Sequence, residues 1–526
     1  MSILDDNVHE SFGDLLLDSD LEAPDSMECD DMDPAVVPGS DQSDSDSQMT
    51  KKQKTPGWTT PNNNEMKSSR SRPANSLTSS RSACLNGNEK INASVRPVLP
   101  WATGSYCLPI VGLRNDLNGS ALQYIRLTSM FDAFSPYIYK NKVGVIEISR
   151  AMKLHKEDNS LNPDQIDLVV RFKVELEVHL SNYFGTRVML AIYGSTLNGF
   201  GTRSCDVDMS LSFPAGPPRG VEVGGMVCPD LVMRAVAKAL VDYPNARDEQ
   251  YICAKVPIVR FRGKDMDIEA DISYRNDLAL HNTELLNQYC KWDEDRLPTL
   301  GIWVKTWAKR CGVGDASKGS LSSYAWILML IHYLQRTEPI RMMPFLQFGM
   351  HIPNESQYVN GWNVDFCKFV DVGQCQRVGI STYELFVGFL DYFSTHFQYD
   401  AHIIQINVPG TVSKVGRWYR CPMVIRDPFE LDHNLAQGVD EDMFRYIRSC
   451  MRHSRTVFMD QNLRTEFLAS KGFRRGAFEK MRMSDDLLRE YGVYLLHACV
   501  PVQQPPVRKF HGRDRTMSCS TNTSAS

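Results

Sequence analysis

One stretch of the chain combines an apolar run, a glycine turn and paired acids: Tyr193-Gly194-Ser195-Thr196-Leu197-Asn198-Gly199-Phe200-Gly201-Thr202-Arg203-Ser204-Cys205-Asp206-Val207-Asp208. Gly194 and Ser195 follow apolar residues that begin at Val188, so they end a predicted strand and open a predicted helix. The start of a helix offers unpaired backbone N–H groups and a positive dipole end, which suit a triphosphate. Such turns are common, so this one does not identify a phosphate site by itself.

Asp206 and Asp208 are the first candidate metal ligands. Alternate residues of a strand point to the same face, so these two carboxylates converge while Val207, Met209 and Leu211 face the core. Two adjacent like charges repel, and a divalent cation is the usual means of neutralising them. The alternative is a solvated polar strand face without a ligand, which a lone Asp-x-Asp pair does not exclude.

A second alternating segment, from Met266 to Ile272, supplies further acids. Asp267, Glu269 and Asp271 would line one face of this strand, and apolar residues the other. A third carboxylate beside the first pair would complete a site for two Mg²⁺ ions. One ion would activate an attacking hydroxyl and the other would neutralise a leaving pyrophosphate. The alternation alone does not choose among the three acids.

Charge and periodicity divide the chain into five segments. Residues 1–96 are predicted to be a disordered tail, because the first 50 residues hold 15 acidic and no basic residues and the next 50 hold 9 basic and 2 acidic ones, without periodic apolar positions. A helical segment at 97–183 leads into a strand-rich domain at 184–283. A helical domain at 284–490 and a polar tail at 491–526 follow. The pattern predicts an α+β fold in which a strand-rich domain precedes a helical one, between disordered termini.

Composition excludes several classes of protein. The 14 cysteines form no C-x-x-C pair and no Cys/His cluster with zinc spacing, so no zinc module is predicted. No apolar run is long enough to cross a bilayer and no apolar leader opens the chain, so we expect no membrane partner and a reducing, intracellular setting.

The Gly-Ser turn, the Asp-x-Asp pair and the distant Glu269-Ala270-Asp271 strand together resemble the DNA-polymerase-β-like nucleotidyltransferases. Within that group the chain is similar to the cytoplasmic terminal nucleotidyltransferases, which include poly(A) and poly(U) polymerases. The resemblance implies a two-lobed fold, with 184–283 as the mixed-sheet nucleotidyltransferase domain and Asp271 as the third catalytic carboxylate. It also implies Mg²⁺ or Mn²⁺ held by Asp206 and Asp208, RNA 3′ ends as substrate, and a cytoplasmic location.

Further matches to the family lie in the helical domain. The resemblance implies ribose contacts, phosphate contacts and a stacking tyrosine at six positions: Asn282, Thr283, Lys305, Lys309, Ser323 and Tyr324. The two lysines are four residues apart and so share one helix face; the alternative is an ordinary solvated face. The segment from Thr382 to Phe393 resembles the helix that opens the family's poly(A)-polymerase-associated region, at about 382–435.

The stretch Arg426-Asp427-Pro428-Phe429-Glu430-Leu431-Asp432-His433-Asn434 resembles the family's nucleotide-recognition loop. In uridylating members a histidine at the position of His433 favours uracil and crowds out adenine. Asp427 and Glu430 would address the polar edge of the base. We therefore predict an RNA uridylyltransferase that uses UTP. The alternatives are a poly(A) polymerase of the same fold that uses ATP, a surface histidine without a ligand, and a catalytically idle RNA-binding scaffold.

RNA contacts outside the catalytic cleft are predicted from two groups of basic residues: Arg445, Arg448, Arg452 and Arg455 at helical spacing, and Lys471, Arg474, Arg475, Lys480 and Arg482. Either group could follow a single strand electrostatically, and the first could equally be a solvated helix face. Substrate choice could instead come from a protein adaptor that binds the acidic tail.

Overall fold

A computed structural model describes residues 141–264, 268–336, 342–350, 355–368, 380–474 and 481–506. The chain divides into two compact units, and all of the described residues belong to one of them. The predicted disordered tail at 1–96 lies outside the described residues, as do Asp267 and the end of the chain from residue 507. No helix in the described ranges is long and apolar enough to cross a membrane.

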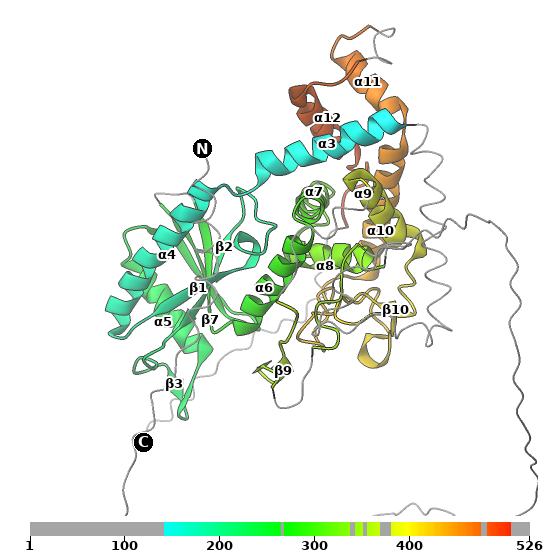
Figure 1. The fold of residues 1–526 in the computed structure, drawn as a ribbon. Helices are drawn as coiled ribbons and strands as arrows, with labels where there is room; N and C mark the ends of the chain where they lie inside the picture. Colours follow the sequence, from blue (N-terminus) through cyan, green and yellow to red (C-terminus); the bar gives the residue numbers. More distant parts are fainter. Residues whose placement is uncertain are drawn as a thin grey trace, which may run out of the picture. The chain divides into compact units, whose positions relative to one another are not determined.

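A five-stranded mixed sheet forms the first domain. Its order is β1 (Met189–Tyr193), β2 (Val207–Ser212), β7 (Glu269–Tyr274), β6 (Ile258–Gly263) and β5 (Ala246–Ile252). Strands β2 and β7 are parallel, and every other neighbouring pair is antiparallel. Helices α4 (Pro163–Phe184) and α5 (Pro229–Val241) cover one face of the sheet (Figure 1).

The buried face of this sheet follows from the alternation of the strands. Val207, Met209 and Leu211 of β2 are at most 2% exposed and pack in one core with residues of α4 and α5 such as Phe172 and Val236. The intervening residues of β2 therefore point to the opposite face. The fold class and the alternating strands predicted from the sequence are confirmed.

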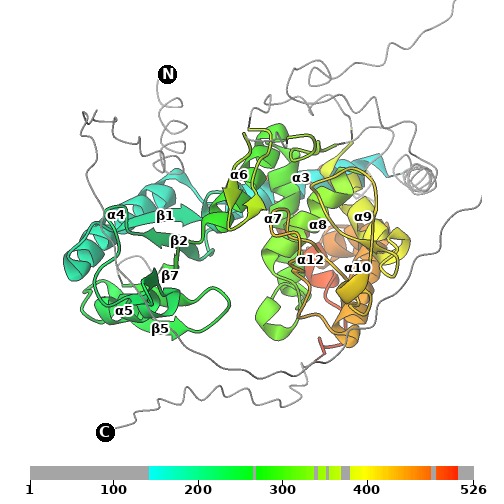
Figure 2. The same cartoon turned by 90° about the horizontal axis from the view of Figure 1, so that it is seen from below.

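The second domain is mainly helical. Its helices are α6 (Asp277–Trp292), α7 (Arg296–Arg310), α8 (Ser323–Leu334), α9 (Thr382–Asp391), a π-helical turn (Tyr392–His396), α10 (Glu441–Met459), α11 (Asn462–Ser470) and α12 (Asp485–Ala498). Trp303, Trp307 and Trp326 are fully buried in its core. Helices α7 to α10 gather around this core in both views (Figures 1 and 2). Short two-stranded pairs complete the fold: β3 (Glu222–Val223) with β4 (Met226–Val227), β8 (Tyr358–Val359) with β9 (Trp362–Asn363), and β10 (His402–Ile403) with β11 (Val412–Ser413).

The first two described helices belong to different domains. Helix α3 (Lys142–Asn159) packs into the helical core through Val145, Ile148 and Ala151, whereas α4 packs on the sheet. A capping box at Asn162 and the proline at 163 start α4, which separates it from α3. The described part of the helical segment predicted at 97–183, residues 141–183, is thus divided between the two domains.

The C-terminal boundary also differs from the prediction. Helix α12 continues to Ala498, beyond residue 490, and Leu495 and Leu496 are at most 1% exposed. The predicted polar tail at 491–526 is therefore wrong for residues 491–498, because Tyr491, Leu495 and Leu496 continue the buried apolar stripe of α12.

Phe200 joins the two domains. It belongs to the loop between β1 and β2, yet its side chain is 0% exposed and lies in the core of the helical domain. A Cβ at Gly301 of α7 would lie 2.2 Å from the Phe200 ring, so only glycine leaves room for it. This insertion fixes the loop that precedes Asp206 against the helix that carries Lys305.

Candidate active site

The register of the sheet brings the predicted carboxylates together. Asp208 of β2 pairs with Asp271 of the neighbouring parallel strand β7. Asp206 comes directly before β2, not within it, and is exposed. Asp271 is only 7% exposed. The three acids chosen from the sequence therefore lie together where β2 and β7 pair within the sheet, with Asp208 and Asp271 on the face opposite the core formed with α4 and α5.

Crowding of these carboxylates disfavours their charged forms. Burial, reinforced by repulsion from Asp271 and Asp206, raises the pKa of Asp208 to about 7. Partial burial and repulsion from Glu269 and Asp271 also raise the pKa of Asp206. The site thus has excess negative charge, which a cation would relieve.

Arg260 is the counter-charge that the sequence prediction missed. Its Nε and Nη2 atoms donate to the two carboxylate oxygens of Asp271 at 2.8 and 2.7 Å. Arg260 pairs with Asp271 in the antiparallel register of β6 and β7, as Arg262 pairs with Glu269. The alternation Ile258-Val259-Arg260-Phe261-Arg262 was the available signal, because it places both arginines on the face opposite the apolar core.

The Gly194–Thr196 segment is a single 3-10 turn, so the helix predicted to open here is wrong. Gly194 has φ +75°, and a Cβ at this position would lie 2.3 Å from Asp208 Oδ2. The turn therefore packs directly against the metal-ligand candidate. Ser195 follows and is half-buried.

Two neighbouring residues of α6, Asn282 and Thr283, link the helical domain to the recognition loop and to this turn. The Gly194 N–H donates to Thr283 Oγ1 at 2.8 Å, and that hydroxyl donates to the Ala279 carbonyl. Thr283 is only 2% exposed, so it positions the turn and its hydroxyl is already used. The half-buried Asn282 donates through Nδ2 to Asp427 at 3.4 Å.

The two lysines of α7 lie at different depths. Lys305 donates to the Phe200 carbonyl at 2.7 Å, and burial lowers its pKa although Asp206 and Asp208 act in the opposite direction. Lys309, one turn further, is exposed. Both lysines interact electrostatically with Asp206, so α7 places two cations on the side of the site where the carboxylates gather.

Helix α8 begins at the predicted Ser-Ser-Tyr motif. Ser322 caps the helix by accepting from the Ala325 N–H at 3.2 Å, which leaves Ser323 exposed at the first helical position. The Tyr324 hydroxyl donates to Asp427 Oδ2 at 3.2 Å. Burial raises the Tyr324 pKa well above its usual value, so the phenol stays neutral.

Asp427 organises the recognition loop. It is 5% exposed, and its Oδ1 accepts from the backbone N–H groups of Phe429 and Glu430 at 2.9 Å each. Its other oxygen is bonded to Tyr324 and Asn282. Both Asp427 oxygens therefore have partners, Oδ1 within the loop and Oδ2 on α6 and α8, and the contact of Asp427 with the base stays a prediction.

Glu430 and His433 lie closer to solvent in the same loop. His433 Nδ1 is 3.4 Å from Glu430 Oε2, and the histidine side chain is 35% exposed. The second Glu430 oxygen forms an ion pair of 2.5 Å with Lys255, which extends from the turn between β5 and β6. Glu430 thereby joins the sheet domain to the recognition loop.

Comparison with known proteins assigns the family. A model described as "Poly(A) RNA polymerase, mitochondrial-like, central palm domain" matches residues 148–291, and "Cid1 family poly A polymerase" matches 383–433. Terminal uridylyltransferase 4 of Homo sapiens is 34% identical over 295 residues, which cover 54% of this chain and only 17% of that protein. Poly(A) RNA polymerase GLD2 of Danio rerio is 30% identical over 360 residues, covering 67% of this chain and 70% of that one.

The chain belongs to the terminal nucleotidyltransferase family.

Solved structures agree on the fold of this terminal nucleotidyltransferase. The structure of mtPAP in complex with ATPgammaS has a TM-score of 0.54 at 21% identity, covering 63% of this chain and 73% of that one. A cytoplasmic RNA terminal U-transferase has a TM-score of 0.50 at 22% identity, covering 60% and 94%. At these identities the likeness concerns the fold, and the roles of individual residues rest on the geometry described above.

The active site of this terminal nucleotidyltransferase has two suitable ligands for a divalent cation, and the remaining ligands would come from outside the chain. Asp206 and Asp208 offer carboxylate oxygens, the ligands that Mg²⁺ and Mn²⁺ prefer, and their mutual repulsion favours a bound cation. Within the described ranges, no three His, Cys, Asp or Glu side chains already form a group that could hold a metal. Mg²⁺ commonly binds one or two carboxylates plus substrate phosphates, so the two aspartates fit such a site.

The predicted RNA-binding stripe of α10 is largely engaged within the protein. Arg445 pairs with Glu441 at 3.3 Å, and Arg455 pairs with Asp391 at 2.7 Å. Arg448 donates to the Ser394 carbonyl at 3.0 Å. Arg452 is exposed. In the second basic group Lys471 pairs with Glu490, Arg474 and Arg482 are exposed, and Arg475 and Lys480 lie outside the described residues.

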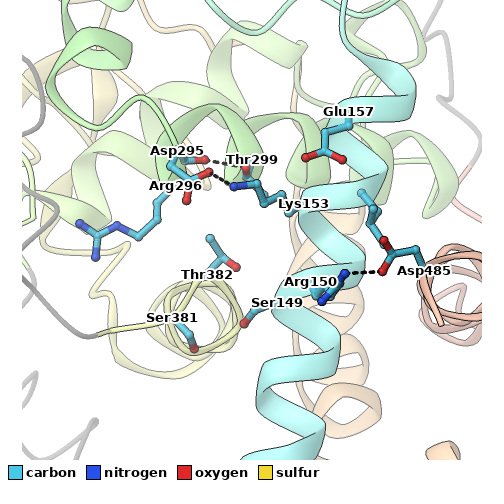
Figure 3. A pocket seen from close by; sticks show the side chains of 11 residues that line it. Ser149, Arg150, Lys153, Glu157, Asp295, Arg296, Thr299, Ser381, Thr382 and Asp485 are labelled. Carbon is cyan, nitrogen blue, oxygen red and sulfur yellow. Dashed lines mark hydrogen bonds and ion pairs between the residues drawn. The ribbon is translucent and has the colours of Figure 1, made fainter. Parts of the chain in front are cut away.

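A separate pocket of about 540 Å³ lies between α3 and the starts of α7 and α9 (Figure 3). None of the predicted site residues lines it. Its cations are matched by acids: Arg150 pairs with Asp485 at 2.7 Å, and Lys153 pairs with Asp295 at 3.1 Å. Because these charges are already compensated, the pocket has no net attraction for a triphosphate.

Proposed function

We propose that the protein transfers UMP from UTP to the 3′ end of an RNA and releases pyrophosphate. The observation that supports UTP is the contact between His433 Nδ1 and Glu430. A carboxylate beside Nδ1 favours a proton on that nitrogen, which leaves Nε2 as an acceptor. The N3–H of uracil is a donor, whereas adenine presents the acceptor N1 and a larger ring, so this loop favours uracil.

The chain's own residues divide the work of the proposed reaction. The RNA 3′ oxygen forms a bond to the α-phosphorus, the bond to pyrophosphate breaks, and Asp271 helps to take the hydroxyl proton. Both Asp271 oxygens are bonded to Arg260, so Arg260 must release one of them first. Lys305, Lys309 and Ser323 would neutralise or hydrogen-bond the phosphates.

Mg²⁺ or Mn²⁺ at Asp206 and Asp208, when bound, would neutralise the triphosphate and acidify the attacking hydroxyl. Replacement of both aspartates with alanine tests this assignment. We expect RNA extension to fall to background while the fold, followed by circular dichroism, is kept. Extension at the wild-type rate would contradict the mechanism.

A poly(A) polymerase is the alternative with a specific observation in its favour. The GLD2 protein of Danio rerio covers 67% of this chain, more than the uridylyltransferase match does. The two functions share the carboxylates and differ in the base that the recognition loop admits. Base choice must therefore be measured directly.

The deciding experiment extends a labelled RNA oligonucleotide with each of the four NTPs separately, using the wild type and His433→Ala. Strong UTP preference that relaxes toward ATP in the variant is the expected result. ATP preference in the wild type would overturn the UTP proposal and leave the carboxylate assignment intact. Failure to extend with any NTP would favour the idle scaffold. The adaptor and the cytoplasmic location stay predictions; loss of targeting in cells on deleting residues 1–50 would support an adaptor.

A further inference from the structure

Two aromatic residues and three arginines gather beside the recognition loop, on the chain that follows β11. We call Arg417, Trp418, Tyr419, Arg420 and Arg426 the stacking platform. Tyr419 is 73% exposed, although a tyrosine usually buries most of its ring. Trp418 is half-buried, and both Arg417 and Arg420 are exposed. None of the contacts that organise the recognition loop uses the Tyr419 ring.

The backbone beneath the stacking platform is held firmly. Lys414 is only 6% exposed, and its ammonium donates to the Tyr399 carbonyl at 3.0 Å. A 3-10 turn from Gly416 to Trp418 follows, with Gly416 at φ +62°. The Cys421 N–H then donates to the Trp418 carbonyl at 3.0 Å. The aromatic rings are therefore presented on an ordered turn, so little backbone entropy is lost when a ligand binds.

The arginines give this surface a positive charge. The guanidinium carbons of Arg426 and Arg417 lie 5.1 and 5.4 Å from the centre of the Trp418 ring, within cation–π range. Arg426 Nε is buried without a hydrogen-bond partner, so its head group is held by the ring. Among the described residues, the one acid that forms an ion pair with the stacking platform is Asp432, which lies 3.6 Å from Arg417.

The stacking platform is continuous with the recognition loop. Arg426 immediately precedes Asp427, and Arg417 donates to the backbone carbonyl of Asp432, the residue before His433. A polymer held on the platform therefore lies beside the base of the incoming nucleotide. An RNA 3′ end must occupy such a position for its hydroxyl to reach the α-phosphate.

We propose that the stacking platform binds the unpaired nucleotides next to the RNA 3′ end. Exposed aromatic rings stack on bases of any sequence, and arginines add cation–π contacts and neutralise phosphates. The inference rests on the proposed function for the identity of the polymer. It also explains how a chain whose α10 arginines are mostly paired within the protein can still hold RNA close to its carboxylates.

Direct RNA binding tests the platform without catalysis. A 5′-fluorescein-labelled single-stranded RNA with a 3′-deoxy end is titrated with the full chain and followed by anisotropy. We expect Tyr419→Ala to weaken binding about tenfold, the effect of losing one stacked base. Tyr419→Phe keeps the ring and should bind within about twofold of wild type. Arg420→Ala should lower the slope of log Kd against log salt by about one.

Tyr358→Ala is the matched control, because Tyr358 is also a highly exposed tyrosine (58%) but lies on β8. It should leave RNA affinity unchanged. Equal RNA binding by wild type and Tyr419→Ala, with equal melting temperatures, would overturn the platform, and so would equal losses in Tyr419→Ala and Tyr358→Ala. A Tyr419→Ala variant that binds RNA normally but loses a protein partner would show that the surface serves proteins and would also overturn it.

Failure of the proposed function gives a different result. If the wild type extends RNA with ATP alone, or with no nucleotide, while Tyr419→Ala still weakens RNA binding, the platform stands and the UTP proposal fails. If the wild type extends RNA with UTP and Tyr419→Ala changes neither RNA affinity nor the KM for RNA, the function stands and the platform fails. The KM for UTP should be unchanged in Tyr419→Ala, since the hydrogen bonds described for Asp427, which organise the recognition loop, do not involve Tyr419.

Discussion

Replacing Gly194 with alanine places one methyl group against the catalytic carboxylate. The new Cβ would lie 2.3 Å from Asp208 Oδ2 and 3.2 Å from its Cγ. The obstructing atom is the end of a side chain, so Asp208 can rotate away and the fold can survive. Rotation moves the carboxylate away from its position beside the Gly194 turn, while the backbone pairing of Asp208 with Asp271 is kept.

The expected magnitudes separate stability from activity. Alanine in the left-handed region, where Gly194 has φ +75°, costs about 1–2 kcal/mol of unfolding free energy. A reacting group misplaced by about 1 Å costs about 10²-fold in rate. Gly185 provides the control, because it has φ +64° with no atom within 4 Å of a built Cβ. Gly185→Ala should show the same loss of stability and no loss of rate.

Two measurements on both variants decide the question. Urea unfolding gives the change in stability, and extension of a labelled RNA at saturating UTP and Mg²⁺ gives the rate. The expected result is a similar loss of stability in the two variants and a rate loss confined to Gly194→Ala. A Gly194→Ala protein that extends RNA within about threefold of Gly185→Ala would refute the role given to Asp208, since a rate change that small is worth under 1 kcal/mol.

Three further predictions follow from the same structure. The pKa of Asp208 is about 7 in the folded protein and lower in the unfolded chain, so its contribution to stability is largest in acid and is lost as pH rises through about 7. Compared with Asp208→Asn, the metal-free wild type should therefore lose unfolding free energy between pH 5 and pH 8, as measured by urea unfolding. Mg²⁺ should restore more of this free energy at pH 8 than at pH 5. Arg260→Met removes the cation paired with Asp271, so the carboxylate site becomes more negative and Mg²⁺ should stabilise the variant more strongly in a thermal-shift assay, while RNA extension falls. Weaker stabilisation by Mg²⁺ would contradict the view that excess negative charge favours the bound cation. Gly492→Leu should cost about 1–3 kcal/mol in urea unfolding by overpacking, because a built Cβ lies 3.4 Å from Ala151; an unchanged midpoint would refute the packing of α12 on α3.

The sequence was most informative where side-chain alternation is strict. β2 and β7 each direct one alternate set of residues into the core with α4 and α5, so the positions of Asp208 and Asp271 on the opposite face could be predicted, although Ser210, Asp271 and Ser273 on that face are buried as well. The parallel pairing that brings them together could not, because alternation does not specify which strands are neighbours. Arg260 went unnoticed for the same reason, since its importance comes from the register of β6 with β7.

Elsewhere the sequence pattern was misread because the decisive contacts are distant along the chain. Gly194 and Ser195 form one 3-10 turn, since Thr283 holds the turn from α6. That Asp427 addresses the base stays a prediction, but its bonds to its own loop, to Asn282 and to Tyr324 could not be foreseen from the sequence. The apolar run from Tyr491 to Val500 was assigned to a polar tail, and the packing of α12 on α3 shows that it continues a buried helix.

The pairing of α3 with α12 sets an order of events during synthesis. Glu147 and Asp158 of α3 form ion pairs with Arg464 at 2.5 Å and with Arg489 at 2.9 Å, so the first described helix is completed by residues near the end of the chain. The sheet domain is contiguous from α4 to β7, and it can fold as soon as residue 274 leaves the ribosome. Helix α3 can pack on α7 and α9 as they emerge, but the part of its surface that packs on α12 stays uncovered until residue 485, more than two hundred residues after the sheet domain is complete. A ribosome stalled in that interval would carry a finished sheet domain beside a helix that chaperones can recognise.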